Sequence, residues 1–167
     1  QQSWRNNNGE TLGDQWIQWD LGASYQLDSI QVWNYNDSSR YAAGIRQVDI
    51  YVSNAAAPGD PEGAGSGNWT LWAENAILDP GPGSAGYTGF DLETAVGSSL
   101  PSSDIRFIRF EVDSTFRSDL INLGGGTGDG ENVAGLAQIE FYQVPEPSSL
   151  ALLGLGGLCM IKRRRRA

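Results

Sequence analysis

Apolar and polar residues alternate along much of the chain, beginning with residues 16–22 (WIQWDLG). From Ile17 onward every second side chain is apolar, so Trp19 is predicted to face inward and Trp16 outward. This period of two is typical of a half-buried strand, and Gly22 is predicted to end it.

The same alternation recurs in later segments that Gly- and Pro-rich stretches separate. Further strands are predicted at residues 30–35, 45–53, 69–73, 90–92, 105–112 and 133–144, and a short one at 120–123. Residues 54–68 and 79–89 are too poor in apolar side chains to pack and are predicted to be surface loops. No segment has a convincing amphipathic helical pattern. We therefore predict an all-β fold, an antiparallel jelly-roll β-sandwich.

Two of these strands have clear inward-facing positions. In residues 105–112 these positions are Ile108, Phe110 and Val112, and in residues 133–144 they are Ala137, Ile139 and Phe141. Arg106 and Arg109 of the strand at 105–112 are expected to form ion pairs across strands.

Charge divides the chain into an acidic body and a basic tail. Residues 1–144 contain six Arg, no Lys and nineteen Asp or Glu, a net charge of −13, whereas residues 145–167 carry a net charge of +4. Nucleic acid is an unsuitable partner for such a body, because binding depends on basic residues that neutralise phosphates. The absence of His and the single Cys159 exclude Ser-His-Asp and Cys-His catalysis and a Cys/His zinc site.

The two ends of the chain differ from the body. Residues 1–14 are polar and include neither an initiator Met nor a signal sequence, so the chain is expected to begin inside a longer precursor. Near the other end, residues 150–161 are apolar or small, and five basic residues follow them. As a helix, this segment would be about 18 Å long, which makes it a marginal membrane span with its basic end in the cytoplasm. A buried terminal helix is the alternative.

The ordered strand sequences resemble a known family. They are WIQWDLG, IQVWNYN, GIRQVDIYVSNA, RFIRFEV and GLAQIEFY. In this order they resemble the discoidin-like, or coagulation-factor type C-like, domains of the galactose-binding-like superfamily, over roughly residues 4–143. The resemblance implies an N-terminally truncated sandwich over residues 1–143, a Pro-rich hinge at 144–149 and a hydrophobic segment with a basic end at 150–167.

The chain departs from this family in two places. The Asp-Gly-containing loop that usually precedes the position of Trp4 is missing, so one sheet edge is expected to lack a partner. Gln138 also stands where the family often has Glu. Both positions bear on the structural calcium (Ca²⁺) of many members, so calcium binding stays an open question here.

The resemblance implies a ligand site in loops at one end of the sandwich. The corresponding residues are Arg5, Asn34, Tyr35, Asn36, Asp37, Arg40, Arg117 and Asp119. Their guanidinium, amide and carboxylate groups can hold sugar hydroxyls, although Asn34, Asp37 and Arg40 could instead cap a turn. Trp33 and Trp72 are further candidates for stacking on a sugar.

The tail resembles the PEP-CTERM sorting signal of Gram-negative bacteria. The motif residues are Val144, Pro145, Glu146 and Pro147, which precede the hydrophobic segment and the Arg cluster. The resemblance implies export, transient anchoring in the inner membrane, cleavage near the motif by an exosortase-type enzyme, and a final position at the cell surface or outside the cell.

Together these features predict an exported, non-catalytic carbohydrate-binding module whose partner is a carbohydrate or exopolysaccharide. The alternative is a structural or adhesive surface protein that binds other proteins, which an exposed apolar patch without converging polar groups would favour. A glycosidase is a third hypothesis, because carboxylate pairs such as Asp20 and Asp28, or Asp113 and Asp119, could act in glycoside hydrolysis.

Overall fold

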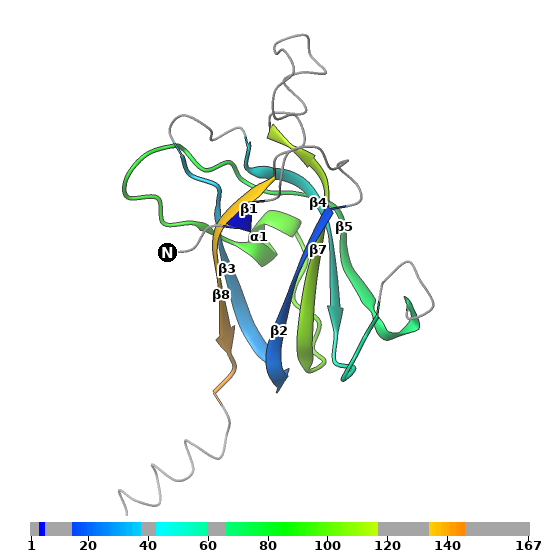
Figure 1. The fold of residues 1–167 in the computed structure, drawn as a ribbon. Coiled ribbons are helices and arrows are strands. Elements are labelled where there is room, and N and C mark those ends of the chain that lie inside the picture. The colour runs from blue at the N-terminus through cyan, green and yellow to red at the C-terminus, as the bar shows by residue number, and fades with distance from the viewer. Residues whose placement is uncertain (1–3, 6–14, 38–42, 60–65, 117–133, 146–167) are drawn as a thin grey trace, which may run out of the picture.

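The computed structural model describes residues 4–5, 15–37, 43–59, 66–116 and 134–145. In these residues the chain forms two four-stranded antiparallel sheets, with strand orders β1-β8-β3-β6 and β2-β7-β4-β5, which lie face to face (Figure 1). The predicted all-β sandwich is therefore confirmed. The predicted strand at 120–123 and the apolar segment at 150–161 lie outside the described residues.

Most successive strands alternate between the two sheets, as in a jelly roll. The first sheet contains β1 (Trp4–Arg5), β8 (Gly135–Gln143), β3 (Leu27–Asn34) and β6 (Phe90–Asp91). The second contains β2 (Gln15–Tyr25), β7 (Ile105–Thr115), β4 (Ile45–Ser53) and β5 (Thr70–Ile77). A short 3-10 helix, η2 (Ser66–Asn68), precedes β5, and a helix, α1 (Leu92–Val96), follows β6. No helix in the described ranges is long and apolar enough to cross a membrane.

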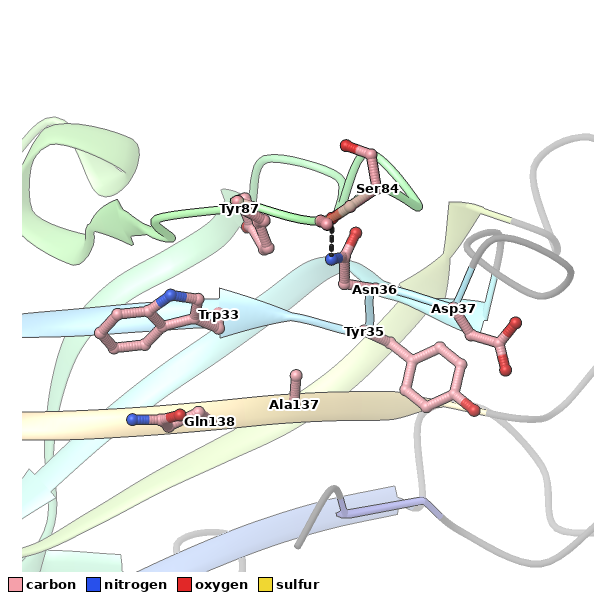
Figure 2. A pocket seen from close by; sticks show the side chains of 10 residues that line it. Trp33, Tyr35, Asn36, Asp37, Ser84, Tyr87, Ala137 and Gln138 are labelled. Atoms are coloured by element: carbon pink, nitrogen blue, oxygen red, sulfur yellow. Dashed lines mark hydrogen bonds between the residues drawn. The ribbon is translucent and has the colours of Figure 1, made fainter. Parts of the chain in front are cut away.

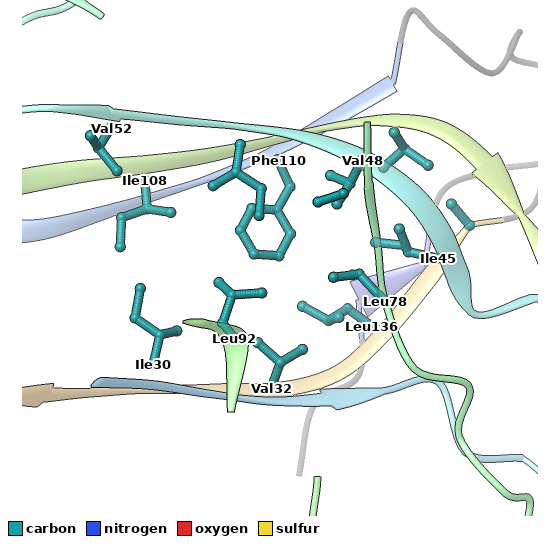
Figure 3. Close-up of a cluster of buried hydrophobic side chains, with 14 of the residues drawn as sticks. Ile30, Val32, Ile45, Val48, Val52, Leu78, Leu92, Ile108, Phe110 and Leu136 are labelled. Carbon is teal, nitrogen blue, oxygen red and sulfur yellow. The ribbon is translucent and has the colours of Figure 1, made fainter. Parts of the chain in front are cut away.

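Aliphatic and aromatic side chains from both sheets fill the space between them (Figure 3). Ile30 and Val32 of β3 are fully buried, as are the predicted inward residues Ile108, Phe110 and Val112 of β7. Burying a side chain of this size contributes about 1.5–3 kcal/mol, so this layer is the main source of the fold's stability.

Trp19 lies at the side of this core, as predicted. Its indole contacts Phe110 edge-on, with ring centroids 5.1 Å apart, and Phe141 of the opposite sheet at 6.1 Å. Edge-to-face geometry is the favoured arrangement of such rings, so Trp19 helps to hold the two sheets together.

In β8 the prediction that Ala137 faces inward is wrong. The pairing of β8 with β3 shifts between Trp33–Gln138 and Asn34–Leu136, which indicates a β-bulge. As a result Leu136 is buried, and Ala137 lines a pocket at the surface instead of entering the core. Ile139 and Phe141 do pack against the core.

The sequence analysis predicted that Gly22 ends its strand, and this prediction is wrong. The strand β2 continues to Tyr25, and its pairing with β7 is irregular between Asp20 and Tyr25. Gly22 has a φ of 82° and donates its N–H to Oδ1 of Asp20 at 2.8 Å. Gly22 thus allows an irregularity inside a long strand, because glycine adopts a positive φ without steric cost.

The helix α1 was not predicted, because it is only five residues long. Asp91 caps its first turn by accepting a hydrogen bond from the N–H of Thr94, and Gly97 ends the helix with a φ of 70°. Leu92 is fully buried and anchors the helix in the core. One turn is too short to give a helical period in the sequence.

The two arginines of β7 form different ion pairs. Arg106 donates two hydrogen bonds of 3.0 Å to Asp20 on the neighbouring strand, as predicted. This hydrogen bonding lowers the pKa of Asp20 and raises the pKa of Arg106. Arg109 instead contacts Glu111 of its own strand at 2.9 Å and lies under the exposed ring of Trp16, 4.3 Å from its centroid.

We predict that Asp113→Asn stabilises the protein at neutral pH. Partial burial, together with the charge of Asp49, raises the pKa of Asp113, so its charged form is disfavoured in the folded state. The gain should be about 0.5 kcal/mol or less, because the side chain is largely solvated, and it should disappear as the pH falls below the ordinary value of 3.8. Urea unfolding at pH 7 and pH 3 measures it.

The exposed Asp28 on the other sheet provides the control, since Asp28→Asn should leave the unfolding midpoint unchanged. Equal stabilisation by both substitutions would mean that the gain comes only from reduced net charge, and that the local contact with Asp49 contributes nothing.

Candidate functional site

An open pocket of about 430 Å³ lies where β3 leaves the sheet (Figure 2). It is lined by Trp33, Tyr35, Asn36, Asp37, Ser84, Ala85, Gly86, Tyr87, Ala137 and Gln138. These residues come from three segments, namely the end of β3, the loop between β5 and β6, and the start of β8. Three aromatic rings and several hydrogen-bonding groups therefore meet at one end of the sandwich.

Trp33 faces the pocket because its neighbours in β3 occupy the core. Val32 and Asn34 have no exposed surface, so the intervening residue points to the outer face. Gln138 of β8 lies directly opposite Trp33 in the sheet. A Cβ atom on Gly89, which has a φ of 74°, would lie only 2.8 Å from the indole ring. Glycine therefore lets the loop cross close to Trp33.

The amide of Asn34 is fully used inside the protein. Its Nδ2 donates to the carbonyls of Ile45 at 2.6 Å and Asp79 at 2.8 Å, and its Oδ1 accepts from the N–H groups of Ile45 and Tyr35. Asn34 is completely buried, so its side chain cannot reach a ligand without rearrangement. Its position in the structure is that of a clamp between β3, β4 and the pocket loop.

Asn36 makes a second clamp on the same loop. Its Nδ2 donates to the carbonyl of Ser84 at 2.8 Å, and its Oδ1 accepts from the N–H of Gly83 at 2.5 Å. The loop also passes so close to β3 that a Cβ atom on Gly81 would collide with the carbonyl of Tyr35. The pocket wall is therefore fixed by hydrogen bonds and by close backbone packing.

Tyr87 is a further aromatic wall of the pocket. Its hydroxyl oxygen accepts a hydrogen bond from the backbone N–H of Asn34 at 3.4 Å. Burial raises the pKa of Tyr87, so the phenol stays protonated at neutral pH. A neutral ring next to Trp33 suits the apolar face of a ligand better than a charged group would.

The structure brings together three of the predicted ligand residues, Tyr35, Asn36 and Asp37. Asn34 lies beneath them, and its amide is hydrogen-bonded to backbone groups. Arg5 lies in β1, and its backbone pairs with Gly135 of β8. Arg40, Arg117 and Asp119 lie outside the described residues. Ligand contact by these side chains stays a prediction.

The other aromatic candidates have different positions. Trp33 lines the pocket, whereas Trp72 packs against the core and donates its Nε1–H to the carbonyl of Ser99 at 2.9 Å. Sequence reasoning missed Tyr87 and Ser84, which lie in a Gly-rich loop without periodicity. The sequence did assign Gln138 to the outer face of its strand but gave no sign that it lies next to Trp33.

The described residues contain no group of three His, Cys, Asp or Glu side chains that could hold a metal ion. The position of Gln138 is also not that of a free ligand, because its Nε2 donates to Oε1 of Glu140 at 2.5 Å.

The sandwich and its end pocket define the class of galactose-binding-like β-sandwich domains. Residues 2–97 match the NedA-like, galactose-binding domain family, and the chain belongs to this family. Residues 143–166 match the PEP-CTERM protein-sorting motif, which indicates export through an exosortase system in Gram-negative bacteria. Both resemblances expected from the sequence are confirmed.

The solved structures that resemble this chain share little sequence with it. The SusE-like protein BT2857 shares 22% identity with a TM-score of 0.44, over 78% of this chain and 47% of that protein. A family 89 glycoside hydrolase from Clostridium perfringens, in complex with 2-acetamido-1,2-dideoxynojirmycin, shares 17% identity with a TM-score of 0.46, over 84% of this chain. The chain spans about half of the first protein and 11% of the second. The curated proteins include no match.

We predict that Asn34→Ala destabilises the protein by about 2–4 kcal/mol, because several buried backbone groups would lose their partner. Asn36→Ala should cost about 1 kcal/mol, since its two hydrogen bonds lie nearer to solvent. Urea unfolding measures both differences. Gln143→Ala, at the exposed end of β8, is the control and should change stability little. A loss below about 0.5 kcal/mol for Asn34→Ala would contradict the clamp.

Proposed function

We propose that the pocket binds a sugar residue of a glycan and performs no chemistry on it. The observation that carries the proposal is the meeting of Trp33, Tyr35 and Tyr87 around one open pocket. Aromatic rings pack on the apolar C–H faces of pyranose rings, while amide and carboxylate groups hydrogen-bond the hydroxyls at the ring edge. Gln138 and Asp37 are placed to supply such groups.

The described residues support binding better than hydrolysis. Glycosidases use two carboxyl groups that flank the scissile bond. Asp37 is the only carboxylate among the described residues that line the pocket. Glu140 of β8 lies two residues beyond the pocket residue Gln138. Both of its carboxylate oxygens accept hydrogen bonds, one from Gln138 and one from Tyr142. Asp20, which could have formed a catalytic pair, is held by Arg106 on the other sheet.

The alternative, a protein-binding adhesive surface, has weaker support. The large exposed apolar residues of the second sheet include Trp16 on β2 and Leu71 on β5. These are the two edge strands, and β7 and β4 separate them. Trp16 also stacks on Arg109, so a cation lies directly under its ring. The two residues therefore do not form the continuous apolar patch that such an interface would need.

We expect Trp33→Ala to weaken glycan binding by about tenfold or more, because loss of an aromatic contact costs at least about 1.5 kcal/mol. Trp33→Phe should retain part of the affinity. Calorimetric titration with galactose and with a panel of mono- and polysaccharides measures the effect. Trp16→Ala is the matched control, an exposed tryptophan on the opposite sheet, and should bind like the wild type. Unchanged binding by Trp33→Ala, or no binding of any sugar by the wild type, contradicts the proposal.

We further propose that the tail is removed after export. In this proposal residues 150–161 hold the chain transiently in the inner membrane, and an exosortase-type enzyme cleaves near Pro145-Glu146-Pro147. The mature domain then remains at the cell surface or in extracellular polysaccharide. The position of the motif supports this order of events, because β8 ends at Gln143 and the N–H of Val144, the first motif residue, donates to the carbonyl of Gln26 at 3.0 Å. Cleavage there would leave every strand of the described residues intact.

We predict that Glu146→Ala prevents or slows this processing in a Gram-negative bacterium that contains an exosortase. Mass spectrometry of the purified protein measures the position of its C-terminus, and the wild type should lack the Arg cluster. Ser149→Ala, just beyond the motif, is the control and should be processed normally. A wild-type protein that retains its full tail would overturn the proposal of cleavage.

A further inference from the structure

A row of three side chains leads away from the pocket along β8. Gln138, Glu140 and Tyr142 occupy alternate positions and face the same outer side of the sheet, opposite Trp33, Gln31 and Ser29 of β3. We call Gln138, Glu140 and Tyr142 the β8 strip. Its first member also lines the pocket, so pocket and strip form one surface.

Glu140 holds both ends of the strip. Its Oε1 accepts from Nε2 of Gln138 at 2.5 Å, and its Oε2 accepts from the hydroxyl of Tyr142 at 2.6 Å. Tyr142, near the end of β8, is nevertheless 47% exposed. The strip therefore presents an aromatic ring to solvent in a fixed position, and such preorganisation lowers the entropic cost of binding.

The length of the strip exceeds what one sugar ring can cover. Tyr142 lies four residue steps along the strand from Gln138, a distance of roughly 13 Å at about 3.3 Å per residue. Aromatic side chains stand at both ends, Trp33 at the pocket and Tyr142 at the far end, with amide and carboxylate groups between them. This alternation matches a chain of sugars, which offers ring faces for stacking and hydroxyls between them.

The negative charge of the pocket and the β8 strip favours uncharged glycans over acidic ones. Asp37 and Glu140 contribute carboxylates, and neither the described pocket lining nor the strip contains Arg or Lys. The body around them has a net charge of −13. A polymer of uronic acids would bring further carboxylates against this surface and would be repelled, whereas uncharged sugars would not.

We propose that the β8 strip extends the pocket into a binding site for a chain of uncharged sugar residues, with Tyr142 as the distal stacking contact. This inference rests on the proposed function of the pocket. It adds to that function a ligand length, a ligand charge and a second aromatic contact.

Calorimetry with galactose and with β-1,4-linked galactose oligomers of two to six units tests the proposal. Wild-type affinity should rise at least tenfold from the monosaccharide to the longer oligomers. Tyr142→Ala should lose most of this gain with oligomer length. Tyr142→Phe, which keeps the ring but loses the hydroxyl, should retain most of the gain, and Trp16→Ala all of it. Polygalacturonate should bind at least tenfold more weakly than the uncharged hexamer.

The possible results distinguish between the β8 strip, the preference for uncharged sugars and the pocket. Affinity that does not rise with length, or a gain that survives Tyr142→Ala, overturns the strip but leaves the pocket proposal intact. Equal binding of polygalacturonate overturns the inference about charge. Failure of galactose and of every oligomer to bind the wild type contradicts the pocket proposal as well as the strip. Circular dichroism of the variants confirms that each keeps its β fold.

Discussion

The buried amide of Asn34 is the constraint on which the pocket depends. It joins β3 to β4 of the opposite sheet through Ile45 and to the pocket loop through the carbonyl of Asp79. A buried amide must have all its partners, because an unsatisfied group costs about 1–3 kcal/mol. The end of β3 and the loop therefore have one favoured arrangement relative to the core. This arrangement also fixes the positions of Trp33 and Tyr35 on either side of Asn34.

The same strand serves the core and the site because its side chains alternate. Ile30 and Val32 face the opposite sheet, while Gln31 and Trp33 face outward. The bulge in β8 then sets which of its residues meet Trp33, because it places Gln138 beside the indole and turns Ala137 away from the core. A regular pairing would have changed the composition of the pocket, since a shift of one residue exchanges the two faces of a strand.

The sequence was sufficient for the sandwich but not for the site. Period-two alternation gave the strands and the inward positions of Ile108 and Phe110, because burial of one face is what that pattern records. It failed at Gly22 and Ala137, where a bulge breaks the period and only the partner strand determines its place. It also could not give the burial of Asn34, because an asparagine near the end of a strand is typical of an exposed turn. The loop with Tyr87 is positioned by contacts distant in sequence, which no local pattern encodes.

The arrangement of the two functional segments follows from the direction of β8. This strand begins at Gly135, passes the pocket at Ala137 and Gln138, and ends at Gln143, just before Val144 starts the sorting motif (Figure 1). A chain held at a membrane by its tail would thus carry the pocket at the end farther from that tail. The β8 strip runs from the pocket to Tyr142, two residues before the motif. The proposed binding pocket and the sorting motif thus lie toward opposite ends of β8.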